Sequence, residues 1–298
     1  MIVAANLTLP ELERFRDFAI DTLRAAGAVT LPRFRAATVV DDKSAPGAAF
    51  DPVTAADREA ESVIRAAIAR SFPEHGMLGE EAGSTPGTGR FAWTIDPIDG
   101  TRGFIAGFVH WGMLLALTLD GRPCLGVVHQ PWTGETWSGS ALGAAFQRTD
   151  PAGNPVGERR TLATRRCGSL DAAVLATTDP YLFEGAEADV FAALRTGTRM
   201  TRYGADCYAY CMLASGQLDL VVESGLGAWD VQALMPVVEA AGGIITDWRG
   251  GDCSAGGQVV AAGDPALHAL ALDVLAPAAA ASTESGQIGQ AQDREQRA

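Results

Sequence analysis

The segment from Phe91 to Thr101 constrains this chain more than any other part of its sequence. An apolar run from Phe91 to Ile95 predicts a short buried strand, which leads directly into Asp96-Pro97-Ile98-Asp99-Gly100-Thr101. Two carboxylates at the end of a buried strand repel one another unless a cation lies between them. Hard oxygen ligands at this density favour Mg²⁺, and backbone N–H groups of a Gly-Thr corner can bind a phosphate. The segment therefore predicts metal-assisted phosphate chemistry.

Composition excludes several classes of protein. The 298-residue chain is 47% hydrophobic, which is enough for a substantial core, and it contains no apolar run of roughly eighteen residues that would predict a membrane span. A formal net charge of −13 argues against nucleic acid and anionic membranes as partners. The N-terminus lacks a charged region followed by an apolar run, so we expect no signal peptide. Five scattered cysteines fit reduced thiols, and we expect a cytoplasmic protein.

The pattern of elements predicts two halves and a tail. In residues 1–150, capping boxes at Thr8 and Thr54 predict two helices. Strands are expected near 77–78 and 91–95, and an antiparallel meander is expected from 111–119, 125–129 and 136–146. The Pro-, Gly- and charge-rich stretch 150–160 predicts the boundary between the halves.

Residues 151–276 alternate short apolar runs and helical patterns, which is typical of an α/β half. Expected elements are a strand at 173–177, helices near 186–194 and 205–215, and further elements at 218–222, 231–241, 243–246, 259–261 and 265–274. Residues 277–298 contain almost no large apolar side chain, so we expect a disordered tail.

Acidic residues recur at four places where strands or helices are expected to begin or end. They are Asp57, Glu80, the pair Asp96 and Asp99, and Asp230. Each has a structural alternative when taken singly: Asp57 can complete a capping box, Glu80 can lie in a solvated turn, and Asp230 can be an N-cap. Together they favour one site, because two-metal centres need carboxylates from separate segments around cations about 3.5–4 Å apart.

At these residues the chain resembles the inositol monophosphatase superfamily of Mg²⁺-dependent, Li⁺-sensitive phosphatases. The resemblance covers about residues 10 to 275, and four segments in the family's order and spacing carry it: 51–57, Gly79-Glu80-Glu81, 93–101 and Trp229-Asp230. It implies a layered α/β sandwich, with an antiparallel sheet flanked by helices in the first half, a smaller α/β half after it, and the active site between them. It also implies a homodimer.

The resemblance further implies the metal ligands. Glu80, Asp96 and the carbonyl of Ile98 would hold a first Mg²⁺. A second would be held by Asp96, Asp99 and Asp230. A weaker third site would use Glu80 and water, which gives two or three ions in each site.

Other roles are implied for the attacking water and the phosphate. Asp57 and Thr101 would orient the water, whose pKa a bound metal lowers toward neutrality. The amides of Gly100 and Thr101 would receive phosphate oxygens. Lys43 lies in a loop where the family often has a lysine near the metals; a solvated loop charge is the alternative. None of the four histidines lies in these motifs, which disfavours a phosphoenzyme.

The second half carries the residues that predict the substrate, a small phosphate ester. The segments 202–210 and 241–248 resemble the histidinol-phosphate phosphatase branch of the superfamily. Histidinol carries an ammonium and an imidazole, so its pocket benefits from carboxylates beyond the metal site, and Asp206 and Glu223 are the candidates. The family position that matches Glu223 contacts the non-phosphate part of the substrate. Asp206 can instead be a helix N-cap, and Arg202 can pair with Asp206 or approach the phosphate.

These residues lead to one expected function and two alternatives. We expect hydrolysis of L-histidinol phosphate, a step of histidine biosynthesis. The first alternative is the same chemistry on myo-inositol 1-phosphate or on another sugar or nucleotide phosphate. The second is a non-catalytic phosphate-binding scaffold, against which the complete set of carboxylates argues.

Overall fold

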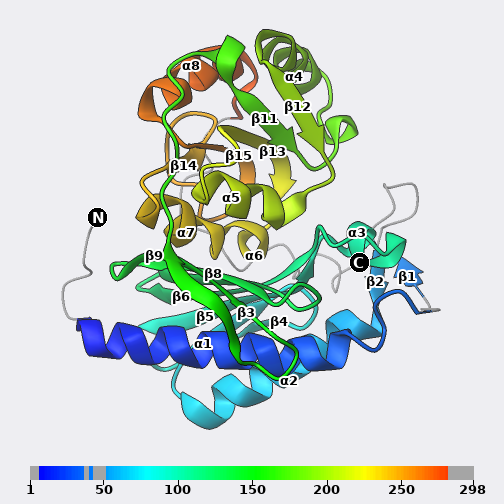
Figure 1. Cartoon of the computed structure of the whole chain (residues 1–298), viewed down its shortest axis with the longest axis vertical. Coiled ribbons are helices and arrows are strands. Elements are labelled where there is room, and N and C mark those ends of the chain that lie inside the picture. Colours follow the sequence, from blue (N-terminus) through cyan, green and yellow to red (C-terminus); the bar gives the residue numbers. More distant parts are fainter. Residues whose placement is uncertain (1–6, 37–39, 43–51, 281–298) are drawn as a thin grey trace, which may run out of the picture.

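The structure is a computed structural model that describes residues 7–36, 40–42 and 52–280. Helices and sheets alternate in stacked layers (Figure 1): a helical layer, a large sheet, a second helical layer, a smaller sheet and an outer helical layer. This arrangement confirms the predicted layered α/β sandwich. Lys43 and the rest of its loop lie outside the described residues.

Two helices with capped N-termini cover one face of the large sheet. Helix α1 (Leu9–Thr30) follows Thr8, whose hydroxyl accepts the N–H of Glu11 while the Glu11 carboxylate accepts the N–H of Thr8. Helix α2 (Ala55–Ser71) follows Thr54, whose N–H donates to Asp57. Both predicted capping boxes are therefore confirmed. The apolar faces of these helices pack in one core with the large sheet.

The large sheet has eight strands. They are β3 (Gly76–Gly79), β4 (Gly83–Thr85), β5 (Phe91–Asp99), β6 (Gly112–Leu119), β7 (Arg122–Gln130), β8 (Glu135–Ser140), β9 (Gly143–Thr149) and β10 (Pro155–Thr161). Their order is β10-β9-β8-β7-β6-β5-β3-β4, and only β3 and β5 run parallel. Strand β6 is buried along its whole length, because helices cover both faces of the sheet. A separate two-stranded sheet joins β1 (Val40–Asp42) and β2 (Pro52–Thr54).

The smaller sheet has five strands and belongs to the second half. They are β11 (Val174–Thr177), β12 (Met200–Tyr203), β13 (Leu220–Leu226), β14 (Ile244–Asp247) and β15 (Gly257–Ala262). Strand β11 runs parallel to both β12 and β13, whereas β15 runs antiparallel to β13 and β14. Short 3₁₀ turns, η1 (Leu170–Ala172) and η2 (Pro180–Leu182), flank β11.

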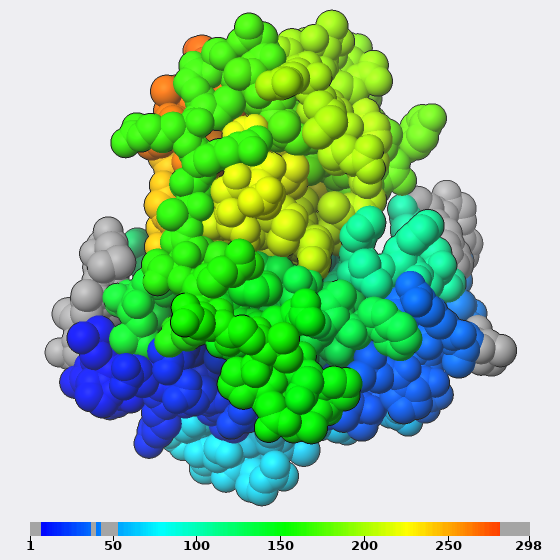
Figure 2. Space-filling model, viewed as in Figure 1, coloured from blue at the N-terminus to red at the C-terminus, as the bar shows by residue number. Residues whose placement is uncertain are grey.

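Helices α5 (Asp206–Ala214), α6 (Ala228–Val231) and α7 (Leu234–Ala240) lie between the two sheets, and α4 (Ala186–Gly197) and α8 (Pro265–Leu275) lie on the outer side of the smaller one (Figure 1). Glycines let α7 approach the large sheet closely: a Cβ on Gly126 would lie 1.9 Å from the carbonyl oxygen of Ala233, and one on Gly139 would lie 2.2 Å from that of Pro236. Figure 2 shows the second half seated on the first, with the short helix α3 (Thr101–Ala106, teal) rising beside it.

Three expected elements differ in the structure. Residues 136–146 form two strands, β8 and β9, and residues 231–241 hold the end of α6 and all of α7. The expected boundary at 150–160 forms a tight turn and β10, which pairs with β9, so the first sheet continues to Thr161. The carboxylate of Asp150 accepts the N–H groups of Ala152 and Asn154, both at 2.9 Å, and thereby reverses the chain.

The ordered part of the second half extends beyond the predicted start of the tail. The turn η3 (Ala276–Ala278) is followed by Ala280, whose N–H donates to the side chain of Gln258 at 2.7 Å and whose carbonyl accepts a guanidinium N–H of Arg249 at 2.9 Å. A 3₁₀ turn and hydrogen bonds therefore attach residues 277–280 to the second half, which corrects the predicted disorder there; residues 281–298 lie outside the described part. None of the described helices combines the length and apolar character needed to cross a membrane.

Candidate metal and phosphate site

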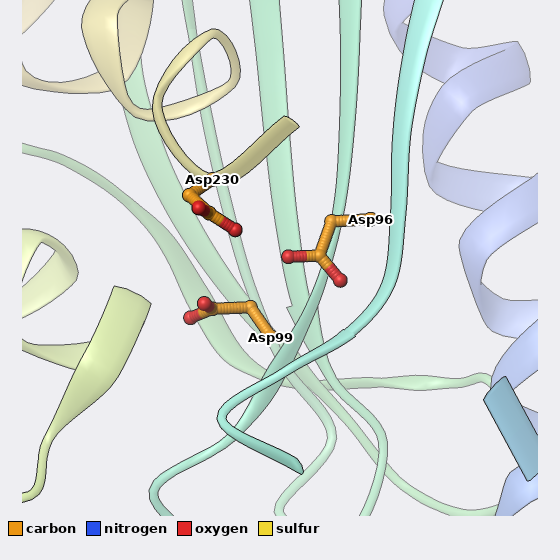
Figure 3. A group of neighbouring side chains, drawn as sticks. All are labelled: Asp96, Asp99 and Asp230. Atoms are coloured by element: carbon orange, nitrogen blue, oxygen red, sulfur yellow. The ribbon is translucent and has the colours of Figure 1, made fainter. Parts of the chain in front are cut away.

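Three aspartates meet where the two halves face each other. Asp96 and Asp99 lie at the end of β5 and Asp230 lies in α6, and one carboxylate oxygen of each falls within 4.8 Å of the others. In Figure 3 the carboxyl groups of Asp96 and Asp230 point toward one another, while Asp99 lies next to both. Side chains three residues apart on a regular strand face opposite sides of the sheet. A shift in the β5–β6 register between Asp96 and Asp99 removes this alternation.

Asp96 is the most constrained member of this triad. Its side chain is 1% exposed, and its Oδ1 accepts the N–H of Ile98 at 3.1 Å. Its Oδ2 is buried and has no hydrogen-bond partner among the described residues. Burial, followed by the charges of Glu80 and Asp99, raises the pKa of Asp96 well above its usual value. An unsatisfied buried oxygen surrounded by carboxylates fits a divalent cation, because a cation would supply the missing partner and cancel the repulsion.

Asp99 and Asp230 are held by backbone N–H groups of the second half. Asp99 Oδ2 accepts the N–H of Cys207 in the first turn of α5 at 2.6 Å, and Asp230 Oδ2 accepts the N–H of Gly227 at 2.6 Å. Burial, followed by the charge of Asp206, raises the pKa of Asp99 to about 7. Gly227 is the N-cap of α6 and Asp230 is the third residue of its first turn, so the N-cap alternative for Asp230 is wrong; its carboxylate accepts the N–H of the N-cap residue and also faces the triad.

Glu80 lies beside the triad but outside its 4.8 Å group. Its N–H donates to the carbonyl of Ile95 at 3.2 Å, which attaches the turn after β3 to β5. Its charge is the largest electrostatic cause of the raised pKa of Asp96 after burial. The charge of Glu80 therefore acts on Asp96, and the first metal position stays a prediction.

The hydroxyl of Thr101 lies near the carboxylate of Asp57, and Gly100 precedes Thr101 in the corner that follows β5. The hydroxyl of Thr101 lies 3.0 Å from the carbonyl of Ile98 and 3.5 Å from Asp57 Oδ1. Asp57 Oδ2 accepts the N–H and the hydroxyl of Thr54 at 2.8 and 2.6 Å, which fixes the carboxylate. Gly100 has φ +83°, a conformation that disfavours side chains. A Cβ there would lie 2.8 Å from the carbonyl oxygen of His110, so this corner needs glycine.

A second pair of carboxylates, Asp206 and Glu223, lies close enough to Asp99 for their charges to interact. Asp206 is the first residue of α5, has φ +45°, and lies against Gly100: its Cγ is 3.1 Å from the position of a Gly100 Cβ. Ala205 is the N-cap of α5, so the N-cap alternative for Asp206 is wrong. Burial raises the pKa of Asp206 to about 7, and the charge of Glu223 contributes next.

Glu223 is held by two threonines to which no sequence motif gives a role. Its side chain is 1% exposed, and its oxygens accept the N–H of Thr178 at 2.7 Å, the Thr178 hydroxyl at 3.0 Å and the Thr177 hydroxyl at 3.1 Å. Burial raises the pKa of Glu223 to about 8, although these hydrogen bonds oppose the shift. Two hydroxyl residues at the end of β11 were the available sequence signal.

The arginine near this pair is Arg102 rather than Arg202. Arg202 is exposed on β12 and forms no ion pair with Asp206 in the part of the chain that the structure describes. Arg102 directly follows the Gly-Thr corner, its charge lowers the pKa of Asp206, and its guanidinium lies 3.5 Å from the carboxylate of Asp179. The proposed pairing of Arg202 with Asp206 is therefore wrong, because β12 directs this side chain to solvent. A cation next to a predicted phosphate corner was the signal for Arg102.

Comparisons with known proteins agree with this geometry. The model of the inositol monophosphatase family matches residues 11–284. The chain is 38% identical over 282 residues to the bifunctional phosphatase IMPL2, chloroplastic, of Arabidopsis thaliana, covering 91% of this chain and 78% of that relative. It is 35% identical over 237 residues to a histidinol-phosphatase of Chlorobaculum parvum, covering 78% and 86%. A solved inositol monophosphatase from Zymomonas mobilis is 40% identical with a TM-score of 0.75, covering 89% and 98%. The chain therefore belongs to the inositol monophosphatase family of phosphatases.

Proposed function

We propose that this protein is a Mg²⁺-dependent phosphomonoesterase that hydrolyses L-histidinol phosphate to L-histidinol and phosphate. The observation that supports this substrate is the pair of the buried Glu223 and the half-buried Asp206 beside the aspartate triad. Two carboxylates whose burial raises their pKa to about 7 and about 8 are poorly solvated, and a cationic ligand would stabilise their charged forms. Histidinol offers an ammonium and an imidazole, whereas inositol is neutral. The 35% identity to a histidinol-phosphatase supports the same substrate.

The metal ligands are proposed as follows. Glu80, Asp96 and the carbonyl of Ile98 would hold one Mg²⁺, and Asp96, Asp99 and Asp230 a second, with a weaker third ion at Glu80. The unsatisfied Oδ2 of Asp96 supports this set. When bound, such ions supply Lewis-acid chemistry, which lowers the pKa of water and neutralises charge on phosphate oxygens.

The chain's own residues would orient the water and the phosphate. The Thr101 hydroxyl has one proton and two acceptors within reach, the carbonyl of Ile98 and Asp57 Oδ1. When it donates to Asp57, the carbonyl becomes available to a cation and the hydroxyl oxygen can accept a hydrogen bond from the attacking water. The N–H groups of Gly100 and Thr101, at the start of α3, would receive phosphate oxygens.

The experiment that tests this function measures phosphate release with Mg²⁺ titrated from zero. The substrates are L-histidinol phosphate, myo-inositol 1-phosphate, nucleotide monophosphates and p-nitrophenyl phosphate. Asp206→Asn is expected to lower kcat/KM for histidinol phosphate by about 10- to 100-fold, because a hydrogen bond to a charged group is lost. The rate on p-nitrophenyl phosphate should change less than about twofold. Asp189→Asn, an exposed position on α4, is the matched control. Equal losses on both substrates contradict a cation-binding role.

A second candidate is hydrolysis of inositol phosphates, which the 40% identity to the Zymomonas mobilis inositol monophosphatase favours. A higher kcat/KM for myo-inositol 1-phosphate than for histidinol phosphate would support it. A protein that releases no phosphate from any of these esters would support the scaffold alternative. The homodimer and the cytoplasmic location stay predictions, and light scattering after size exclusion measures the oligomeric state.

A further inference from the structure

Helix α2 carries a second buried carboxylate, Glu61, one helical turn after Asp57. Its side chain is 1% exposed, and it lies beneath the turn that joins β3 to β4 and bears Glu80. Burying a glutamate is unfavourable unless its oxygens are satisfied. The partners of Glu61 therefore indicate what this side chain does.

The partners are the backbone N–H groups that follow Glu80. Glu61 Oε2 accepts the N–H of Glu81 at 2.8 Å, and its Oε1 accepts the N–H of Ala82 at 3.1 Å. On the other side of Glu80, a Cβ on Gly79 would lie 2.1 Å from Glu61 Oε1, so the carboxylate fills the space that a side chain would need. The backbone on both sides of Glu80 is thus fitted to the carboxylate of Glu61.

Arg65, one turn further along α2, completes the attachment. Its Nε donates to Glu61 Oε1 at 2.6 Å, its Nη1 lies 3.1 Å from the Thr85 hydroxyl, and its Nη2 donates to the carbonyl of Gly83. The charged pair therefore binds the turn from Glu81 to Thr85 through several charge-assisted hydrogen bonds, which are stronger than neutral ones.

We propose that Glu61 is a positioning residue that holds Glu80 in place for metal binding. Helix α2 carries both Asp57, which contacts Thr101, and Glu61, which holds the Glu80 turn. One helix would thereby fix two loops of the site relative to β5. A turn between two short strands at the sheet edge would otherwise lose conformational entropy each time Glu80 bound an ion. The fixed turn removes that cost before the ion arrives.

Because this assignment rests on the proposed metal site, its test measures ion binding directly. Mn²⁺ binding to the substrate-free full chain is followed by electron paramagnetic resonance and calorimetry for the wild type, Glu61→Gln and Glu61→Asp. Glutamine keeps the volume but loses the charge and turns an N–H donor toward an N–H group. The Kd of the ion that uses Glu80 is expected to rise about tenfold in Glu61→Gln, as for other residues that orient a metal ligand. Glu61→Asp keeps the charge and should give an intermediate Kd.

Kinetics provide a second measurement. The Mg²⁺ concentration for half-maximal phosphate release should rise by about the same factor, while kcat at saturating Mg²⁺ and KM for the phosphate ester stay within about twofold. The matched control is Glu59→Gln, an exposed glutamate on α2 that pairs with Arg33 and should leave the ion Kd unchanged. Thermal unfolding in EDTA identifies the temperature range in which each variant is folded.

The outcomes separate the two proposals. A wild-type chain that binds no Mn²⁺ overturns the metal site and this inference with it. A wild type that binds Mn²⁺, together with folded Glu61→Gln and Glu61→Asp variants of unchanged Kd and stoichiometry, overturns only the positioning role. A purely structural role for Glu61 would lower the unfolding temperature and leave the ion Kd unchanged.

Discussion

The buried carboxyl of Glu223 predicts an unusual dependence of stability on pH. Burial raises its pKa from 4.5 to about 8 in the folded chain. Between these values the unfolded chain has released the proton and the folded chain still holds it. Stability therefore falls as pH rises across this window, since the folded state binds more protons than the unfolded state. Glu223→Gln should remove this dependence, because an amide resembles the protonated carboxyl and does not titrate.

The magnitude follows from the size of the window. One proton held only by the folded state changes the free energy of unfolding by about 1.4 kcal/mol per pH unit. Between pH 5.5 and 7.5 the wild type should thus lose about 2–3 kcal/mol relative to Glu223→Gln. Glutamine can keep the native contacts: its oxygen accepts from Thr178, and its NH₂ donates to the Thr177 hydroxyl. The difference therefore isolates ionisation.

Urea unfolding in EDTA at several pH values measures this difference. The control is Glu158→Gln on β10, which is exposed and should differ from the wild type by less than about 0.5 kcal/mol at every pH. The denaturant slopes of the compared proteins must agree for the comparison to hold. A constant difference between the wild type and Glu223→Gln from pH 5.5 to 7.5 would refute the reasoning.

Three further predictions concern the first half of the site. Asp96→Asn should not lower the free energy of unfolding in EDTA, because burial already favours the neutral carboxyl. The same substitution removes a proposed metal ligand, so it should reduce Mg²⁺-dependent phosphate release by more than the roughly 100-fold that is typical when a residue orienting a ligand is lost. Gly100→Ala should cost about 1–2 kcal/mol for its positive φ and lower the unfolding temperature by about 2–8 °C; an unchanged melting curve contradicts it. Arg102→Met should raise the pKa of Asp206, whose ionised form Arg102 favours. If ionised Asp206 binds the cationic part of histidinol phosphate, KM should fall as pH rises through this pKa, and in the variant that fall should occur at higher pH. Identical KM profiles for the two proteins from pH 6 to 9 would count against this.

Features set by short-range patterns were predictable from the sequence. The capping boxes at Thr8 and Thr54 depend on residues three positions apart, and both helices begin where these boxes predict. The end of β5 was predictable for the same reason, since its apolar run and its carboxylates are adjacent in the chain. That Asp230 lies close to Asp96 was expected only from the resemblance to a family, because no local sequence pattern links these two residues.

Contacts between distant segments account for what the sequence could not predict. The ion pair of Arg102 with Asp179 joins residues 77 positions apart, and Glu61 accepts a hydrogen bond from Glu81, which is 20 positions away. No periodicity connects such residues. The conformation of residues 150–160 was not predictable for another reason: proline, glycine and charged residues are equally typical of a linker and of a tight turn. The carboxylate of Asp150 made it a turn.

The two halves contribute different parts of the site, and two of the contacts between them lie at the Gly-Thr corner. Cys207 binds Asp99, while Asp206 packs on Gly100. The triad thus depends on the first turn of α5, which also presents the carboxylate that we propose to contact the substrate. A change at Glu223 would alter the charge beside the substrate without touching any of these contacts, because its hydrogen bonds go to β11 and the residue after it. A substitution that alters the size of the Asp206 side chain, unlike Asp206→Asn, would also disturb the corner that would bind phosphate. Substitutions at Glu223 should therefore change substrate preference with less effect on the metal centre than substitutions that alter the size of Asp206.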